Sequence, residues 1–457
     1  REALEDMLYR MEFGKSRPKG LNRQTNGFLN WINNSVGAIM FINGRSAVLQ
    51  TMSMVNFLNF ADNNIFAAAK AFANQPQYWS DFSTIFNSDY LKNRRSGLKQ
   101  DINSAEMVES IKNSDNKFTA AVAWLLEKGF LPTKIMDSFA IAAGGSTFYR
   151  NRIQKLMKQG VSKQDAEKQA FDDMVQTAEP LQQSSRPDMV SQQQGSILGH
   201  LVLAFQNVTM QYTRIQKKAL LDIINRRTTP PNDNLTQSNI SNSSRILYYG
   251  IVQNAIFYSL QSAMFALGFG DEEEEEQQAL FDKKSERVVN GMLDSTLRGT
   301  GIYGAILATA KNYALEMAKE DKKSYSQTEA NPIIQALNLM PPVGSKVRKL
   351  VSAQRSLKFG KNVRKDMSLF NIDNPVWDAS SNIIEATTNI PTNRVYNKIQ
   401  NVREVGDERN SNLQRIFLLI GWDKWGLGVE NEEFEEAKKQ SNRKNKKKNK
   451  KRKSIGF

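Results

Sequence analysis

The sequence predicts an all-α protein, and three observations carry that prediction. Apolar residues recur three and four positions apart along almost the whole chain of 457 residues. Strict alternation of apolar and polar residues over six or more positions is scarce, so β-strands are not expected. Prolines and glycines interrupt the helical pattern without a fixed period, which argues against a solenoid. We therefore expect an elongated multi-helix assembly of helical hairpins with a disordered basic C-terminal tail.

Residues 160–180 show how the predicted helices begin and end. Gly160 follows a basic stretch and suits the left-handed position after a helix C-terminus. Ser162 suits the N-cap of the next helix, with Asp165 three residues later as in a capping box. Pro180 stands where this helix should stop. One stripe of the helix is apolar and is made by residues four apart: Ala166, Ala170, Met174 and Ala178.

Proline-marked breaks divide the rest of the chain. Pro230-Pro231 opens a polar stretch that we expect to be an exposed loop. Asn331-Pro332 and Pro341-Pro342 mark later breaks, and Ser345 can cap the helix that follows. Asn374-Pro375 and Ile390-Pro391 mark two more turns. The predicted regions are an N-terminal helical region (1–129), a second helical region (130–229), a polar loop (230–244), a helical hairpin region with an acidic run (245–330), a C-terminal helical region (331–437) and a disordered basic tail (438–457).

The net charge of +15 is concentrated at one end of the chain. Residues 438–457 contain eleven Lys or Arg and no acidic residue, which leaves +4 for residues 1–437. Such a segment cannot bury apolar area, and its cations suit the phosphate backbone of nucleic acid. A solubilising tail and a localisation signal are the alternatives. The candidate nucleic-acid-binding residues are Arg443, Lys444, Lys446, Lys447, Lys448, Lys450, Lys451, Arg452 and Lys453.

Residues 246–270 form an uncharged stretch of 25 residues, long enough to span a bilayer as a helix. Gln253, Asn254 and Gln261 interrupt it, and amide side chains are costly in hydrocarbon unless another helix pairs them. Residues 189–213 show the same combination. We expect buried core helices, with conditional membrane insertion as the alternative.

The composition excludes several kinds of active site. Cysteine is absent, which removes disulfides, thiol nucleophiles and Cys-bearing zinc sites. The single histidine, His200, lies in an apolar run, where a hydrogen-bonded core residue is the expected role. No P-loop motif and no dinucleotide-binding motif is present. We therefore expect a protein that is not an enzyme, with no catalytic residue, no metal and no cofactor.

Three short patterns are weaker candidates for binding sites. Gly144-Gly145-Ser146 suits either a close helix–helix contact or an anion-binding helix start aided by Arg150 and Arg152. The basic residues at 92–99 beside Tyr90 suit either phosphate contact or a solvated helix end: Lys92, Arg94, Arg95 and Lys99. The acidic run at 271–276 is expected to be a solvated loop or helix start, with a divalent-cation patch as the alternative. Trp422 and Trp425 are expected to anchor a late helix.

From residue 130 onward the chain resembles a segment of large polyvalent proteins, the internal virion proteins of short-tailed, crAss-like phages. The resemblance lies in the amino-acid sequence of several stretches and in the order in which they follow one another. It spans roughly residues 130–430. It includes FLPTKIMDSFAIAAGGSTFYRNRIQKLMKQG, then SQQQGSILGHLVLAF, YYGIVQNAIF, RVVNGMLDSTLRGTGIYGA, LMPPVGSKVRKL and IGWDKWGLGV.

The resemblance implies a cargo or ejection protein that is packaged in the capsid and leaves with the genome. It would then act in the host envelope or cytoplasm. The implied partners are packaged double-stranded DNA, other virion proteins such as the portal and sister cargo proteins, and the host membrane. It also implies that the chain is one processed piece, consistent with Arg1 where Met is expected. No catalytic residue is carried over.

The alternative function is an accessory or scaffold piece of a larger virion RNA polymerase or DNA-processing polypeptide. Polymerases of this class carry a metal-binding DxDGD signature, and no such run occurs in this sequence. A reading frame that extends far upstream and encodes that signature would favour this alternative.

Overall fold

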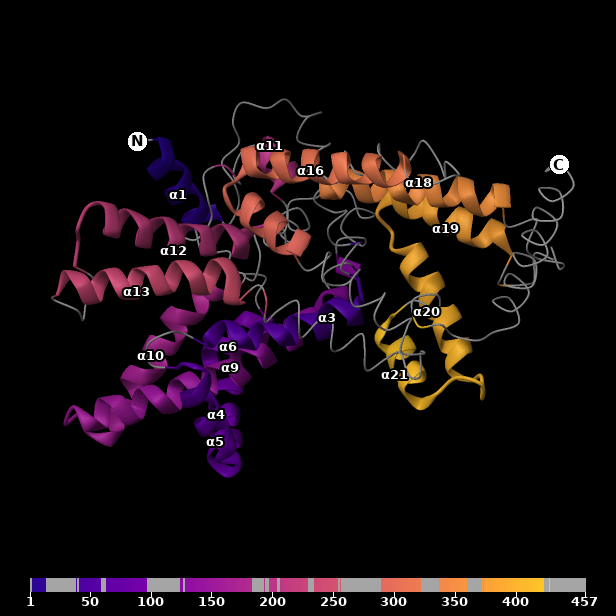
Figure 1. The fold of residues 1–457 in the computed structure, drawn as a ribbon. Helices are drawn as coiled ribbons and strands as arrows, with labels where there is room; N and C mark the ends of the chain where they lie inside the picture. Colours follow the sequence, from indigo (N-terminus) through magenta and orange to yellow (C-terminus); the bar gives the residue numbers. More distant parts are fainter. Residues whose placement is uncertain are drawn as a thin grey trace, which may run out of the picture. The chain divides into compact units, whose positions relative to one another are not determined.

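Every regular element in the part of the chain that the structure describes is a helix, which confirms the all-α prediction (Figure 1). The structure is a computed structural model. The residues that it describes are 2–13, 38, 41–58, 63–96, 124–125, 128–182, 193, 197–203, 206–228, 234–253, 255, 289–321, 337, 339–359, 372, 374–422 and 427.

The chain divides into two compact units. Unit 1 takes in the described residues up to Gly344, and unit 2 takes in those from Ser345 onward. The boundary falls inside a helix, α18 (Pro341–Phe359), rather than at a loop. The break expected at Asn331-Pro332 lies outside the described residues.

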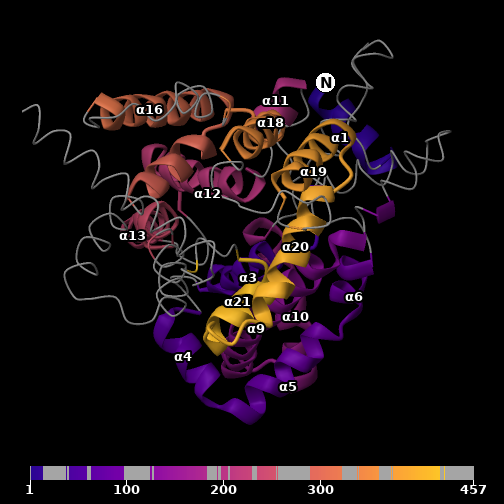
Figure 2. The same ribbon diagram turned by 90° about the vertical axis from the view of Figure 1, so that its right-hand side faces the viewer.

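The centre of unit 1 is α9 (Leu131–Lys158), a helix of 28 residues. The elements that pack on α9 come both from before it and from after it in the sequence (Figure 2). They are α3 (Gly44–Thr51), the 3-10 helix η1 (Met52–Phe57), α4 (Ile65–Ala73), α5 (Gln75–Phe86), α6 (Asp89–Ser96) and α10 (Lys163–Leu181). The N-terminal helix α1 (Glu2–Phe13) precedes them.

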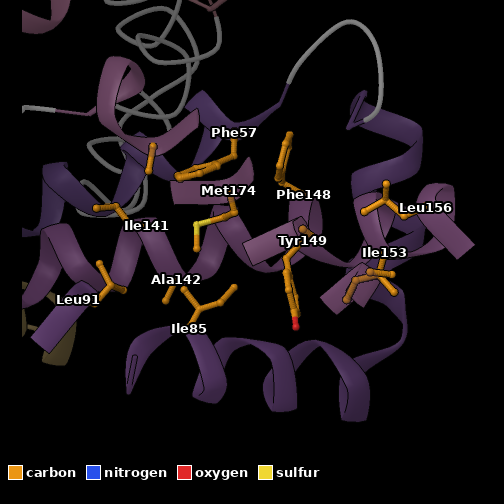
Figure 3. Packing of buried hydrophobic residues seen from close by; sticks show 13 residues of the cluster. Phe57, Ile85, Leu91, Ile141, Ala142, Phe148, Tyr149, Ile153, Leu156 and Met174 are labelled. Carbon is orange, nitrogen blue, oxygen red and sulfur yellow. The ribbon is translucent and has the colours of Figure 1, made fainter. Parts of the chain in front are cut away.

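The main hydrophobic core of unit 1 lies where α9 meets α10, α5 and η1 (Figure 3). Phe57, Ile85 and Ile141 are completely buried there. The apolar stripe predicted on α10 is confirmed, because Ala166, Ala170, Met174 and Ala178 are all fully buried in this core.

The residues predicted to begin and end α10 are also found in those roles. Gly160 has a φ of 88°, a left-handed conformation that glycine adopts without strain. The Ser162 side chain accepts a hydrogen bond from the backbone N–H of Asp165 and so caps α10. Pro180 lies one residue before the last residue of the helix, Leu181. The missing N–H of proline therefore removes one helical hydrogen bond in the last turn only, and the helix ends directly after it.

The remaining described helices of unit 1 include two pairs. In the first, α12 (Asn207–Ile224) packs against α13 (Leu235–Leu247), which continues into a short π-helix, η2 (Tyr248–Val252). In the second, the helix at 289–299 is joined through Gly301 to α16 (Ile302–Asp321), and α11 (Ile197–Val202) contacts α16. Lys311 and Asp294 form an ion pair of 2.8 Å across this second hairpin.

The polar loop predicted at 230–244 is wrong over most of its length. Residues from Leu235 belong to α13. The Asn234 side chain accepts a hydrogen bond from the backbone N–H of Thr236, so this polar residue caps a helix. Ser238 and Asn242 are fully buried. The sequence of this stretch suggested a loop because polar residues occupy buried positions of the helix.

The described part of unit 2 contains the end of α18 and three further helices, α19 (Pro375–Thr388), α20 (Thr392–Val405) and α21 (Asn412–Ile420). Asn374 caps α19 and Pro375 occupies its first turn, as the Asn374-Pro375 break predicts. Ser345 does not cap α18, because the helix already begins at Pro341, whose fixed φ suits a first turn. The Ser411 and Gln414 side chains form a capping box at the start of α21.

Candidate functional site

The strongest sequence-based candidate lies beyond what the structure describes. All nine predicted nucleic-acid-binding residues, from Arg443 to Lys453, fall outside the described residues. So do the acidic run at 271–276, most of the uncharged stretch at 246–270, Lys99 and Trp425. The predictions for these residues therefore stay predictions.

Arg94, which the sequence places in a basic cluster, is part of a buried ion-pair network. Its Nε atom donates to Oδ2 of Asp137 at 2.7 Å, and its Nη1 lies 3.8 Å from Oε1 of Glu179. The exposed fractions of these three side chains are 5%, 4% and 8%. The Tyr90 hydroxyl donates to Glu179, and the Gln50 amide donates to Asp137. Arg94 is thus neither a phosphate contact nor part of a solvated helix end.

This network ties three helices together. Arg94 and Tyr90 lie on α6, Asp137 lies on α9 and Glu179 lies on α10. Burial raises the pKa of the Tyr90 hydroxyl, and the Glu179 carboxylate adds to that effect, so the hydroxyl remains a donor. Lys92, one turn from the network, remains 58% exposed beside Asp89, as a solvated helix end would be. Arg95 lies over the Phe86 ring at 4.2 Å.

Gly144-Gly145-Ser146 lies in the middle of α9, which excludes the anion-binding helix start and confirms the close helix contact. A Cβ atom on Gly144 would lie 2.3 Å from the backbone oxygen of Met54 in η1. On Gly145 it would lie 3.1 Å from the sulfur of Met174 in α10. The two glycines therefore let η1 and α10 approach the α9 backbone.

The arginines expected to assist at that site have protein partners. The Arg150 guanidinium makes an ion pair with Asp81 on α5. The Arg152 Nε atom donates to Oδ2 of Asp173 on α10 at 2.6 Å. Asp173 is therefore paired, whereas its neighbour Asp172 is exposed.

Gln253, from the uncharged stretch at 246–270, pairs with polar side chains of other helices, as a buried core helix requires. Gln253 donates to Oδ1 of Asn56 at 2.6 Å and to the Tyr212 hydroxyl at 2.9 Å. Asn56 and Tyr212 in turn both donate to the backbone oxygen of Leu181, at the end of α10. This network joins η1, α10, α12 and the residue after η2. Gln253 is 3% exposed, so this part of the uncharged stretch is core.

An open groove of about 500 Å³ lies beside this network in unit 1. Apolar side chains from α9, α12 and η2 line it, including Phe148, Ile215 and Tyr249, and the Arg152–Asp173 pair lies at its polar part. Its lining offers one paired cation and one paired anion, which gives no preference for a charged ligand.

A second buried charged cluster lies in unit 2, between α18, α19 and α20. The Glu385 side chain is fully buried and makes an ion pair with Lys349. Its other oxygen accepts hydrogen bonds from the backbone N–H groups of Asn393, at 2.9 Å, and Arg394, at 3.2 Å. Glu385 therefore satisfies the first turn of α20. Lys346, 5% exposed, donates to the backbone oxygen of Ala386 at the end of α19.

Sequence reasoning did not single out this cluster, although a signal was present. Glu385 is the only charged residue between Asp378 and Arg394. A lone carboxylate in an uncharged helical stretch is expected to be buried against a cation. The basic helix that supplies the cation, α18, lies about 40 residues earlier, and only the fold brings the two together.

The stability of unit 2 should rise between pH 8 and pH 10. Burial lowers the pKa of the Lys346 ammonium group from 10.5 to about 8, repulsion from Lys349 lowers it further, and Glu385 opposes both. In this pH range the unfolded chain holds a proton that the folded chain has lost, so rising pH favours the folded state. A shift of this size corresponds to about 3 kcal/mol. Urea unfolding at pH 8, 9 and 10 measures the effect.

The Lys346→Met variant is the control for this prediction. It should show a smaller rise over the same range, because only Lys349 and Lys398, whose pKa values burial also lowers, remain to lose protons there. An equal rise in stability in both proteins would contradict the assignment to Lys346. The range stops at pH 10 because burial raises the pKa of Tyr212 and Tyr248 in unit 1, so unit 1 loses stability above that pH.

The structure also places two further residues that the sequence singled out, His200 and Trp422. His200 lies in α11, and its side chain is outside the described part. Trp422 is buried against Phe417, with ring centroids 5.1 Å apart, and so anchors α21 as expected.

Among the described residues, no group of three or more His, Cys, Asp or Glu is arranged to hold a metal ion. None of the described helices is both long and apolar enough to cross a bilayer.

The chain matches no protein-family model, and no curated protein or solved structure is significantly similar to it.

Proposed function

We propose that the chain is a non-enzymatic phage virion protein that is packaged in the capsid and ejected with the genome. It acts by packing its helices on partner proteins and by tethering DNA through the basic tail. Its partners are packaged double-stranded DNA, the portal, sister cargo proteins and the host envelope. Its location is the capsid interior and then the host envelope or cytoplasm. The residue order of 130–430 and the separate basic tail support this proposal.

One structural observation supports the packing part of the proposal: a buried group of charged residues in unit 1 is compensated internally, whereas many large apolar residues among the described ones remain exposed. Arg94, Asp137 and Glu179 compensate one another inside unit 1. In contrast, α4 and α5 form a surface that contains only two charged residues between Asn64 and Ser88. One of these, Asp81, is buried in its ion pair with Arg150. Ile65, Phe66, Phe72 and Trp79 are about half exposed or more on this surface.

The α4–α5 surface suits contact with another macromolecule. Phe66 is 87% exposed, which leaves almost all of its ring in water. Burying such rings against a partner releases about 25 cal/mol per Å² of apolar area. A structural component of an assembly would use a surface of this kind, because exposed clusters of apolar side chains mark interaction sites. Sister virion proteins or the envelope would cover it in the proposed function.

Mass spectrometry of gradient-purified phage particles tests the proposal. Peptides from both units should be found in the particles at a constant ratio to the major capsid protein across the gradient peak. A phage-encoded replication enzyme measured in the same fractions serves as the control for cellular contamination. Absence of the peptides, or an abundance that follows the replication enzyme, would contradict the proposed function.

A further inference from the structure

The outer side of α12 combines lysines with large aliphatic side chains. Lys217, Leu221 and Ile224 follow one another at spacings of four and three residues, which places them on one face of the helix. Lys218 and Leu220 lie on the same side, next to Lys217 and Leu221 in the sequence. All five residues are exposed, and Ile224 is 64% exposed. We call these five residues the outer face of α12.

The opposite side of α12 packs inside unit 1. Ala219 is buried there, and α12 contacts α10, α13 and η2 (Figure 1). Asp222, the only acidic residue of α12, is also buried and therefore does not lie on the outer face. Among the described residues, neither Lys217 nor Lys218 has an acidic partner. The outer face is thus not part of the core of unit 1, and no described carboxylate pairs with its lysines.

Cations and aliphatic side chains continue beyond the outer face. Arg226 and Arg227 are exposed directly after the end of α12. The paired helix, α13, exposes Ile240 and Leu247, which lie about two turns apart and are each more than half exposed. Residues 234–270 contain no acidic residue at all. Both helices therefore expose apolar area without exposing negative charge.

The mixture of lysines and aliphatic side chains indicates what the outer face binds. Duplex nucleic acid would engage the lysines, but its phosphate backbone offers nothing on which Leu221 and Ile224 could pack. A protein interface also uses directional hydrogen bonds, about one per 100–200 Å², whereas the outer face offers only the flexible ammonium groups of its lysines. A bilayer with anionic headgroups offers both phosphates for the lysines and an acyl-chain boundary for the aliphatic side chains.

We propose that the outer face of α12 binds the surface of a bilayer that contains anionic phospholipid, with the helix lying in the plane of the interface. The lysine stems extend to the headgroups while Leu220, Leu221 and Ile224 enter the acyl-chain boundary. The proposal deepens the host-envelope partner of the proposed function, on which its biological setting rests, by naming the lipid class and the residues. A helix that lies on a bilayer needs no membrane-spanning length, and none of the described helices has it.

The test uses the full-length chain in which the nine candidate residues of the tail are replaced by Gln, so that the tail does not bind the vesicles. Its partitioning is measured by co-sedimentation with vesicles of phosphatidylcholine alone and with vesicles of equal parts phosphatidylcholine and phosphatidylglycerol. The anionic vesicles should bind the chain far more tightly. Since a lysine near an anionic surface contributes about fivefold, Lys217→Gln/Lys218→Gln should lower the partition coefficient by about 25-fold. Leu221→Gln/Ile224→Gln should lower it by about tenfold or more, because it removes apolar area from the contact.

The matched control is Lys158→Gln/Lys168→Gln, which removes the same charge from two exposed residues elsewhere in unit 1. It should leave the partition coefficient nearly unchanged, and thermal unfolding checks that each variant remains folded. The proposal is overturned if the chain does not bind anionic vesicles, if neutral vesicles bind it equally well, or if the two lysine variants have equal effects.

The aliphatic variant separates a bilayer from a polyanion. Binding that depends on Lys217 and Lys218 but not on Leu221 and Ile224 would assign the outer face to a polyanion such as nucleic acid, and would overturn the proposal. A chain that is absent from virions but passes the vesicle test would refute the proposed function alone. A chain that is packaged in virions but fails the vesicle test would refute only the role of the outer face.

Discussion

Deletion of residues 438–457 should remove most of the salt-dependent affinity of the chain for double-stranded DNA. This segment holds eleven of the cations and no acid, whereas residues 1–437 carry only +4. If the nine candidate residues from Arg443 to Lys453 each neutralise one phosphate, they contribute a slope of about −8 to log K against log[salt]. The intact chain should then lose about 10³–10⁵-fold in affinity between 50 and 200 mM salt.

The control for this deletion is a tail of unchanged length in which the same nine residues are replaced by Gln. Its affinity should match that of the deletion, because only charge is expected to matter in a segment without aromatic residues between its cations. The net charge of +4 on residues 1–437 should account for the shallow slope that remains. A deletion that leaves the slope as steep as before would show that the tail only increases solubility.

The Arg94→Met substitution should destabilise unit 1 by about 3–5 kcal/mol. Methionine fills much of the space of the arginine side chain, but it leaves the carboxylates of Asp137 and Glu179 without their cation at positions that are almost fully buried. An unpaired charge in such a place costs far more than an exposed pair contributes. Urea unfolding followed by the circular dichroism of the helices measures the change.

Lys92→Met on the same helix is the matched control. Lys92 is exposed, and its ion pair with Asp89 is a surface pair, so this change should cost no more than about 0.5 kcal/mol. The double variant Arg94→Met/Asp137→Leu should recover part of the loss, because it removes one of the two uncompensated carboxylates. Equal stabilities for Arg94→Met and Lys92→Met would contradict the account of the network.

Local signals in the sequence predicted the helices around residue 160 well. Gly160, Ser162 and Pro180 act within one or two turns of their own positions, so their roles do not depend on the rest of the fold. The close contact at Gly144 was likewise one of two expected outcomes, and the apolar stripe of α10 follows directly from its four-residue spacing.

Features that depend on distant segments could not be predicted in the same way. Arg94 looked like a surface cation because its partners, Asp137 and Glu179, lie 43 and 85 residues away in sequence. Asn242 looked like a loop residue because buried amides break the usual link between polarity and exposure. Lys349 and Glu385 belong to different helices, and neither shows from its own neighbours that they meet.

The central claim, that the chain is capsid cargo which leaves with the genome, is tested most directly by comparing intact phage particles with emptied ones. Particles are triggered to release their DNA, the empty capsids are repurified, and the chain is quantified in both by mass spectrometry against the major capsid protein. The account predicts that the chain is present in intact particles and largely lost from emptied capsids. Its absence from intact particles, or its full retention in emptied capsids, would contradict the account.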